Sequence, residues 1–419
     1  MYQTVRHLLP RVGEPARVWW LRLDHPLLMN VPMGELVKGV LGVAPAGAPT
    51  YLFLDEITYA EQWDLWLKTF YDDGRPVQVV GTSSATAALR DRRLESGVGR
   101  WEEQYLAPYC FKEYLDLRKV DTSGWAAGPH LGATIDGWFD RTQPAPDLAD
   151  HRRRFILTGG FPELLLSGAV TATTDETTLL LQSQRTLRSD AVERAVYKDI
   201  PQTFDLYNPL LLERLLYTLA GQFTGILSPT TIGQTLGLSQ PTFDRYLSYL
   251  ERAFLVFTLL NYSGNEGVKQ KRGRKLYFVD GAVRNAALQR GVGPLSDPGE
   301  MGLLFENLVA SHLHSLGQQG QVRLYYWRDK DDEIDLVYDH PDAPLAFEIA
   351  SSAGHKRGGI LAFMARFPQF RGRCYLVAPN LTPRRASQSA DGIGSLPLDV
   401  LLLAISAQTE KELAARLGA

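Results

Sequence analysis

The chain has 419 residues, of which 45% are hydrophobic and 22% are charged, and its formal net charge is −3. At roughly 150 residues per domain this length predicts two or three domains, and the composition excludes a disordered or fibrous protein. The longest apolar runs, residues 360–365 and 400–405, are far shorter than the roughly 20 residues of a membrane helix, so no membrane partner is expected.

The net charge and the cysteine content exclude further classes of protein. The small net charge gives no global attraction to nucleic acid, so any such binding must depend on a local basic patch. The two cysteines, Cys110 and Cys374, are far apart in the sequence. They exclude a disulfide scaffold and a zinc site built mainly from cysteine, and a reducing, cytoplasmic environment is expected.

The N-terminal part of the chain alternates strand and helix patterns. Apolar or β-branched runs at residues 17–23, 50–54 and 77–80 predict strands, and residues 62–71 have helical spacing. Strand, helix and strand at these intervals are typical of a parallel α/β sheet. We therefore expect an N-terminal α/β domain built on parallel strands.

Two acidic residues, Asp55 and Glu56, end the second of these runs. Ligands of parallel sheets bind beyond the carboxyl ends of the strands. At that position an aspartate can hold Mg²⁺ and an adjacent glutamate can polarise the water that attacks a phosphate, which is the Walker B arrangement. Taken alone, a solvated strand end explains the two acids equally well.

Further motifs follow in a fixed order. Gly81-Thr82-Ser83-Ser84 comes after the next strand, then Gly99-Arg100, and then Leu106, Pro108, Phe111, Glu113 and Tyr114. The later motifs are Gly159-Gly160-Phe161-Pro162-Glu163, Lys198-Asp199-Ile200, Phe305-Glu306-Asn307-Leu308-Val309 and Glu333-Ile334-Asp335. In this combination, which spans nearly the whole chain, the sequence resembles a family of prokaryotic AAA-type ATPases with a C-terminal domain of unknown function, DUF4143.

The resemblance implies roles for five residues and a pair of ligands, ATP and Mg²⁺. Asp55 and Glu56 would form Walker B, with Mg²⁺ held at Asp55. Thr82 or Ser83 would sense the γ-phosphate, and Arg100 would be a phosphate-facing arginine that stabilises charge.

One motif of that family does not occur in the sequence. It is GxxxxGK[ST], the loop whose backbone amides and lysine cradle the phosphates. In the family this loop precedes the strand at residues 17–23 by one helix, which here would be residues 1–10. Either the true start lies upstream or the loop was lost, and the later motifs favour a truncated reading frame. We expect ATP binding and hydrolysis to be impaired in the chain as it stands.

Helical periodicity dominates the middle of the chain. Residues 229–236 and 240–254 predict two helices joined by a glycine turn, with Ser239 as the N-cap of the second helix. Two helices in this arrangement are typical of a helix-turn-helix. Runs at residues 255–260 and 275–279 predict a β-hairpin that would complete a winged helix.

The tip of that hairpin is expected to be basic. It holds Lys269, Lys271, Arg272, Arg274 and Lys275. Such side chains neutralise phosphates, as sequence-independent DNA binding requires, so DNA is a candidate partner. The alternative is a solvated hairpin beside a helix-turn-helix that serves only protein packing.

The last third of the chain contains three acidic residues in the order of a known nuclease motif. Glu306 lies on a predicted helix, and Asp335 and Glu348 lie on two predicted strands. This is the PD-(D/E)xK nuclease arrangement, in which carboxylates hold a metal ion and a lysine steadies the attacking hydroxide. Ala350 stands where that lysine should be, and Lys356 is a candidate replacement. We favour a nuclease-like fold kept for binding or assembly over an active nuclease.

These patterns predict four segments and three competing functions. The segments are a truncated AAA-type domain with a parallel sheet and no P-loop at residues 1–122, a linker at 123–149, a winged-helix-like helical domain at 150–295 and a restriction-endonuclease-like α/β domain at 296–419. The leading hypothesis is an ATP-binding, DNA-associated AAA-type protein whose nucleotide state moves the other domains. The alternatives are a non-enzymatic DNA-binding or scaffolding protein and a metal-dependent nuclease that uses Lys356.

Overall fold

The chain forms two compact units. The computed structural model describes residues 1–45, 49–74, 76–83, 100–141, 147–166, 175–204, 206–265, 273–320, 322–352 and 354–417. The first unit comprises Met1–Gln104 and Ala195–Pro209, and the second comprises Tyr105–Arg194 and Leu210–Ala419.

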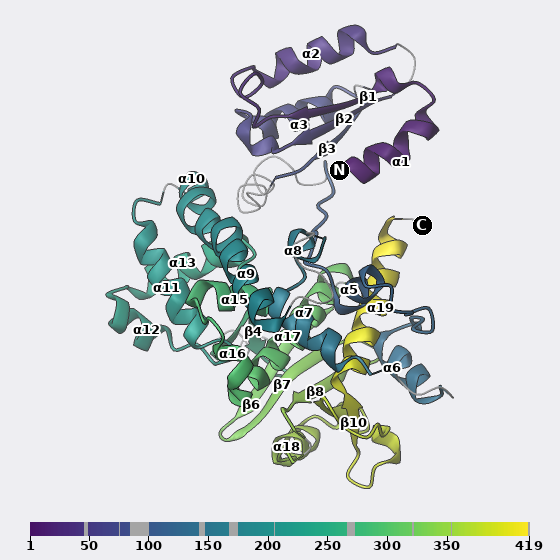
Figure 1. The fold of residues 1–419 in the computed structure, drawn as a ribbon, viewed down its shortest axis with the longest axis vertical. Helices are drawn as coiled ribbons and strands as arrows, with labels where there is room; N and C mark the ends of the chain where they lie inside the picture. Colours follow the sequence, from purple (N-terminus) through teal and green to yellow (C-terminus); the bar gives the residue numbers. More distant parts are fainter. Residues whose placement is uncertain are drawn as a thin grey trace. The chain divides into compact units, whose positions relative to one another are not determined.

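The first unit is built on a three-stranded sheet (Figure 1). The strand order is β1-β2-β3, with β1 at Val18–Arg22, β2 at Thr50–Asp55 and β3 at Val77–Gly81. Both strand pairings are parallel, so the carboxyl ends of all three strands lie at the same edge. The predicted parallel α/β sheet is confirmed.

Helices α2 (Met33–Val43) and α3 (Trp63–Asp72) connect these strands. The unit also contains α1 (Tyr2–Val12) and α10 (Ile200–Phe204), with 3-10 turns at Pro15–Arg17 and Ile57–Tyr59 and a π-helical turn at Ala195–Asp199. Leu52 of β2, Val37 of α2 and Phe70 of α3 are buried in one hydrophobic cluster. Burying side chains of this size contributes about 1.5–3 kcal/mol each, so the cluster fixes the strand that ends in Asp55.

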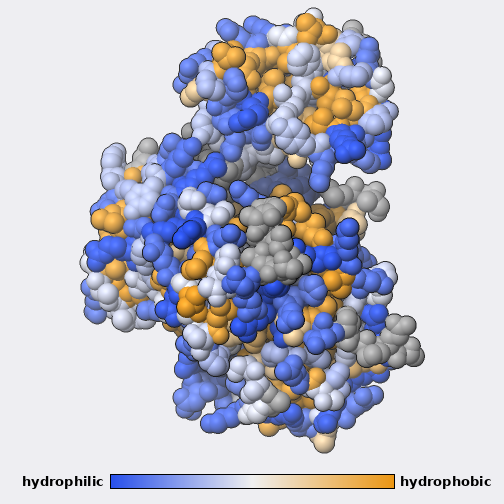
Figure 2. Space-filling model, viewed as in Figure 1, coloured by the Kyte–Doolittle hydropathy of each residue, from blue (hydrophilic) through white to orange (hydrophobic). Residues whose placement is uncertain are grey.

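Apolar side chains also reach the surface of the first unit. Figure 2 shows hydrophobic groups on it, and the large exposed side chains include Leu27, Val43 and Val80. No helix in the described parts of the chain combines the length and the hydropathy that crossing a bilayer requires.

The second unit is built on a mixed seven-stranded sheet in the order β10-β9-β8-β7-β6-β4-β5. The strands are β4 (Val256–Asn261), β5 (Arg274–Phe278), β6 (Arg323–Asp329), β7 (Asp332–Asp339), β8 (Leu345–Ile349), β9 (Cys374–Ala378) and β10 (Ile393–Pro397). β7 is antiparallel to both neighbours, whereas β8, β9 and β10 are mutually parallel. The two strands predicted to carry Asp335 and Glu348 are therefore present, as β7 and β8.

Helices pack on both faces of this sheet. Phe347 of β8 joins a cluster with residues of α17 (Pro298–Gly320) and α19 (Leu398–Leu417). Its neighbour Ala346 joins a second cluster with residues of α18 (Gly358–Arg366). Successive residues of a strand point to opposite faces, so the long helices and α18 lie on opposite sides of the sheet.

The remaining helices belong mainly to the second unit. They are α5 (Phe111–Leu117), α6 (Leu131–Phe139), α7 (Ala149–Thr158), α8 (Pro162–Leu166), α9 (Glu176–Leu187) with a π-helical extension at Arg188–Glu193, α11 (Pro209–Gly221), α12 (Pro229–Leu236), α13 (Gln240–Arg252), α15 (Gly281–Leu288) and α16 (Gly293–Ser296), and a 3-10 turn at each of Pro368–Phe370 and Ala386–Gln388.

Helix α6 lies inside the range 123–149 that the sequence analysis interprets as a linker, so that interpretation needs correction. Leu131 and Ile135 of α6 are fully buried and pack in the cluster that contains α19. Thr134 Oγ1 donates a hydrogen bond to Gln408 Oε1 at 2.9 Å. The helix is short and rich in small residues, and tertiary packing stabilises it more than local periodicity does.

The two predicted helices of the helix-turn-helix are present as α12 and α13. Gly237 adopts a left-handed conformation with φ 69° between them, which glycine reaches without steric cost. The Ser239 side chain caps α13 by accepting from the Thr242 amide. The hairpin β4–β5 follows, but β4 also pairs with β6. The hairpin is therefore part of the large sheet, and that sheet draws strands from both sides of the expected boundary at residue 295.

A buried carboxylate explains the paired glycines Gly159-Gly160. Asp280 Oδ2 accepts from the Gly160 amide at 2.8 Å, while Asp280 Oδ1 accepts from the Ala282 amide in the first turn of α15, also at 2.8 Å. Gly159 has φ 69°, and a Cβ there would lie 2.7 Å from Asp280 Oδ2. The motif therefore joins α7 to α15, and burial raises the pKa of Asp280 to about 6.

Candidate functional site

Two predicted site residues meet at the carboxyl edge of the first unit's sheet. Asp55 is the last residue of β2, and Thr82 directly follows β3. Thr82 Oγ1 donates a hydrogen bond to Asp55 Oδ1 at 2.7 Å. The backbone supports the contact, because the Thr82 amide donates to the Leu54 carbonyl at 3.0 Å. A carboxylate and a hydroxyl are thus held together where parallel sheets bind ligands.

Glu56 and Ser83 lie at the same edge. Glu56 adopts the left-handed conformation, with φ 52° and ψ 51°, which costs a non-glycine residue roughly 1–2 kcal/mol. The chain turns there into the 3-10 segment that contains Thr58. Thr58 Oγ1 and Ser83 Oγ lie 2.8 Å apart and share a hydrogen bond. The structure therefore brings together four of the five residues assigned to the nucleotide centre.

Arg100, the fifth residue, lies elsewhere. Its Nε donates to Asp72 Oδ1 at 3.1 Å, and Asp72 is the last residue of α3. Helix α3 runs back from the carboxyl end of β2 to the start of β3, so Asp72 lies at the far end of the sheet from Asp55. The expectation that Arg100 faces the phosphates beside Asp55 and Thr82 is not supported by this placement.

The residues at this edge are suited to the metal ion that accompanies a nucleotide and not to its phosphates. Asp55 provides the carboxylate oxygen that Mg²⁺ prefers, and Glu56 is an adjacent acid. The phosphates require a glycine-rich loop with a lysine, and no GxxxxGK[ST] motif occurs in the 419 residues. The two acids at this edge are thus of a type that suits a metal ion, whereas the sequence holds no phosphate-loop motif.

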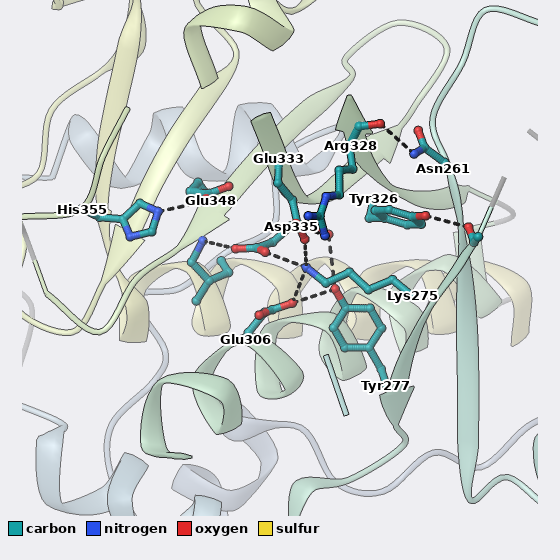
Figure 3. Close-up of polar contacts among 12 residues, drawn as sticks. Asn261, Lys275, Tyr277, Glu306, Tyr326, Arg328, Glu333, Asp335, Glu348 and His355 are labelled. Carbon is teal, nitrogen blue, oxygen red and sulfur yellow. Dashed lines mark hydrogen bonds and ion pairs between the residues drawn. The ribbon is translucent and has the colours of Figure 1, made fainter. Parts of the chain in front are cut away.

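A second polar centre lies in the second unit (Figure 3). Glu306 comes from α17, Asp335 from β7 and Glu348 from β8, as the nuclease-like pattern predicts. The residue at its middle, Lys275, is not among the residues that the sequence pattern places there. Lys275 Nζ lies 2.9 Å from Glu306 Oε1, 2.8 Å from Asp335 Oδ1 and 2.6 Å from Glu333 Oε1.

Lys275 was expected at an exposed basic hairpin tip, and that expectation is wrong. The residue is only 2% exposed, because it is the second residue of β5 and its side chain enters the acidic centre. Arg274 is exposed and lies 3.8 Å from Asp244. Lys269, Lys271 and Arg272 lie outside the described residues. A lysine that directly precedes the apolar run Leu276–Phe278 is the sequence signal for an inward-facing strand position.

Lys356 is not brought to the acids. It is exposed, and its neighbour His355 contacts the centre instead, with Nε2 2.8 Å from Glu348 Oε1. Ala350, in the place of the usual lysine, is buried at the end of β8. The cation of this centre is therefore Lys275 from β5.

Further hydrogen bonds complete the centre. Tyr277 donates from its hydroxyl to Glu306 Oε1 at 2.9 Å, and the same hydroxyl is 3.3 Å from the Asp335 carbonyl oxygen. Asp335 Oδ2 accepts from the Ile349 amide at 2.9 Å. Both carboxylate oxygens of Asp335 are therefore engaged within the protein.

The charges in this centre shift each other's pKa values. Burial would lower the pKa of Lys275, but the negative charges of Asp335 and Glu306 outweigh it and raise that pKa well above its usual value. Burial and the neighbouring charge of Asp335 raise the pKa of Glu306 to about 8 and that of Glu348 to about 7. Lys275 is thus firmly charged, and the pKa values of Glu306 and Glu348 both lie above the ordinary value of a glutamate.

Glu306→Gln should flatten the dependence of stability on pH. Because the pKa of Glu306 is higher in the folded state than its ordinary value of 4.5, the folded state keeps a proton that the unfolded state releases. The free energy of unfolding of the wild type therefore falls as pH rises from about 5 to about 8. Glutamine keeps an acceptor for Tyr277 and Lys275 but cannot ionise, so the fall becomes smaller.

Urea unfolding at pH 5, 6, 7 and 8 measures this effect. Glu163→Gln is the matched control, since Glu163 is an exposed glutamate of α8 in the same unit. If Glu306→Gln and Glu163→Gln show the same pH slope as the wild type, the raised pKa of Glu306 is contradicted.

Comparisons with known proteins divide the chain into three matched regions. Residues 1–115 match a family described as an AAA domain. Residues 149–292 and 301–391 match two families described as domains of unknown function, DUF8612 and DUF4143. The first and last matches support an AAA-type ATPase-like family with a C-terminal DUF4143 region, as the motifs indicate. No solved structure is significantly similar to the chain.

Relatives with similar sequences are themselves uncharacterized proteins. Two from Methanocaldococcus jannaschii are 25% and 24% identical over 75% and 76% of this chain, and the match covers 64% and 65% of their own length. One from Haemophilus influenzae is 22% identical over 74% of this chain and 69% of its own length. The matches to the two M. jannaschii proteins therefore span just under two thirds of those relatives.

Proposed function

We propose that the carboxyl edge of the first sheet is the Mg²⁺ and water side of an AAA-type nucleotide centre. The hydrogen bond between Thr82 Oγ1 and Asp55 Oδ1, at 2.7 Å, carries the proposal. It joins the side chains that the family resemblance assigns to the γ-phosphate sensor and to Walker B. The AAA-domain match over residues 1–115 supports an ATPase-like protein in the same region.

The roles follow from position. Asp55 would hold Mg²⁺, and Glu56 would orient water, since it is the next residue and the chain turns at it. Thr82 or Ser83 would respond to a terminal phosphate, because Thr82 contacts Asp55 at the end of β2 and Ser83 contacts Thr58 in the turn that follows. The phosphate-binding loop is not in the sequence, so we derive no hydrolytic step for this chain.

The purified 419-residue chain should hydrolyse ATP at or near background, because no lysine-bearing phosphate loop is present. The measurement is phosphate release at saturating ATP and Mg²⁺. Joining a GxxxxGK[ST] loop to the N-terminus should raise turnover, and Glu56→Gln should then abolish it while nucleotide binding persists.

Glu61→Gln serves as the control, because Glu61 is an exposed glutamate five residues further along the same segment. Robust turnover by the unmodified chain that Glu56→Gln removes and Glu61→Gln leaves intact would contradict the background activity. Turnover in the extended chain that survives Glu56→Gln would contradict the Walker B role.

We also propose that the α12–α13 pair and the β4–β5 hairpin contact DNA without sequence preference. Gly237 and Ser239 build the tight turn between the helices. The hairpin connection holds Lys269, Lys271 and Arg272, and the exposed Arg274 follows them. Lys275 is excluded from this interface because its ammonium is buried among acids.

Replacing Lys269, Lys271, Arg272 and Arg274 by alanine should weaken DNA binding and flatten its salt dependence. Each phosphate contact contributes about 0.9 to the slope of log K against log salt, so the slope should fall by roughly 3–4. The measurement is fluorescence anisotropy of a labelled duplex from low to moderate salt.

The control variant removes the same number of positive charges at exposed positions away from the hairpin, namely Lys38, Arg366, Arg371 and Arg384. A slope that changes as much in this control as in the hairpin variant would show only a net-charge effect. An unchanged slope in the hairpin variant would move the interface elsewhere.

A further inference from the structure

We propose that the Lys275 ammonium takes the place of a divalent metal ion, so that the acidic centre of Glu306, Glu333 and Asp335 is a latent metal site closed by an internal cation. This goes beyond the nucleotide centre, since it concerns the other unit. It also accounts for a nuclease-like set of acids in a chain that has the buried Ala350 at the position of the nuclease lysine.

The contacts of Lys275 are those of a cation that fills its site. An ammonium has three N–H donors, and Lys275 Nζ meets three carboxylate oxygens at 2.6–2.9 Å. The oxygens come from α17 and β7, elements that are fixed in the core. Mg²⁺ would require carboxylate oxygens at about 2.0–2.1 Å, so the present spacing of the acids is that of an ammonium.

As they stand around Lys275, the acids of this centre do not form a metal site. No group of three or more histidine, cysteine or acidic side chains among the described residues is arranged to hold a metal ion. With Lys275 removed, the same oxygens need to move inwards by less than an ångström to reach metal distances. The latent site thus differs from the present one by one side chain.

The centre also contains a carboxylate oxygen, Glu348 Oε2, that does not contact the Lys275 ammonium. Glu348 is 9% exposed, and its Oε1 contacts His355. Its Oε2 is buried with no hydrogen-bond partner among the described residues. Figure 3 shows Glu348 beside Asp335, and the charge of Asp335 acts on it. A buried carboxylate oxygen that accepts no hydrogen bond is costly, and a bound cation would offset that cost.

The charge balance points the same way. Three carboxyl groups contact one ammonium, those of Glu306, Glu333 and Asp335, while Glu348 contacts His355. Arg328 lies 3.7 Å from Glu333. Without Lys275 the carboxylate of Asp335, which is buried, would lose the cation beside it, and a buried charge is costly unless a cation neutralises it. A divalent ion supplies two charges where the lysine supplied one.

Mn²⁺ binding to the full chain tests the proposal. Binding is followed by electron paramagnetic resonance at pH 7.5 for the wild type, Lys275→Met, Lys275→Met/Asp335→Asn and Arg274→Met. Methionine keeps the unbranched stem of lysine and removes its charge. Arg274→Met is the matched control, because Arg274 is the adjacent basic residue but is exposed.

The wild type and Arg274→Met should bind no Mn²⁺ at this centre, whereas Lys275→Met should gain one site with at least a tenfold higher affinity. Asp335→Asn should remove that gain. A folded Lys275→Met that gains no site overturns the proposal. A wild type that binds one Mn²⁺ and nicks plasmid DNA, with both properties lost in Lys275→Met, also overturns it, because Lys275 would then be a nuclease lysine.

A second measurement applies if Lys275→Met does not fold alone. A ligand that binds only the folded state stabilises it, so Mn²⁺ added during refolding should restore the folded population of Lys275→Met, followed by circular dichroism. It should not restore Lys275→Met/Asp335→Asn. Failure of Mn²⁺ to restore the single variant overturns the proposal.

Discussion

The fold of the second unit depends on one buried ammonium. Its sheet consists of a β4–β5 hairpin and a set of five further strands. Between the two parts Leu260 pairs with Tyr325 and Asn261 with Tyr326, and the Tyr262 amide donates to the Tyr326 carbonyl at 2.6 Å. Side chains complete the connection. Lys275 reaches from β5 to acids on β7 and α17, and Tyr326 donates from its hydroxyl to the Gly273 carbonyl at 2.6 Å. Because a lysine at 2% exposure is tolerated only with such partners, these elements must come together.

The two acidic centres of the chain show how environment decides what a carboxylate does. Asp55 is partly buried at a strand end, and its hydrogen-bond partner is a neutral hydroxyl, that of Thr82. Asp335 is buried, and both its oxygens are committed to Lys275 and to the Ile349 amide. The same residue type contacts a neutral hydroxyl in one unit and holds strands together through a buried ion pair in the other.

Local patterns in the sequence predicted much of the fold. The parallel strands that end in Asp55 and precede Thr82, the turn at Gly237 and the two strands that carry Asp335 and Glu348 follow from periodicity and from turn residues, which act over a few positions. The residues gathered at the carboxyl edge could also be predicted, because parallel strands place their ends together.

Long-range pairing could not be predicted in the same way. Lys275 and Asp335 are 60 residues apart, and a lysine beside other basic residues resembles an exposed patch until its acceptors are known. Arg100 has its partner in Asp72 on the preceding helix, and α6 depends on α19 near the end of the chain. In each case the deciding contact lies outside any local window of the sequence.

During translation the ribosome synthesises Lys275 before Glu333 and Asp335, which follow by 58 and 60 residues. A nascent chain that ends between them has a charged lysine with no acceptors on β7, so strand β5 cannot be buried at that stage of translation. Lys275 therefore gains its acceptors on β7 only after that strand has left the exit tunnel.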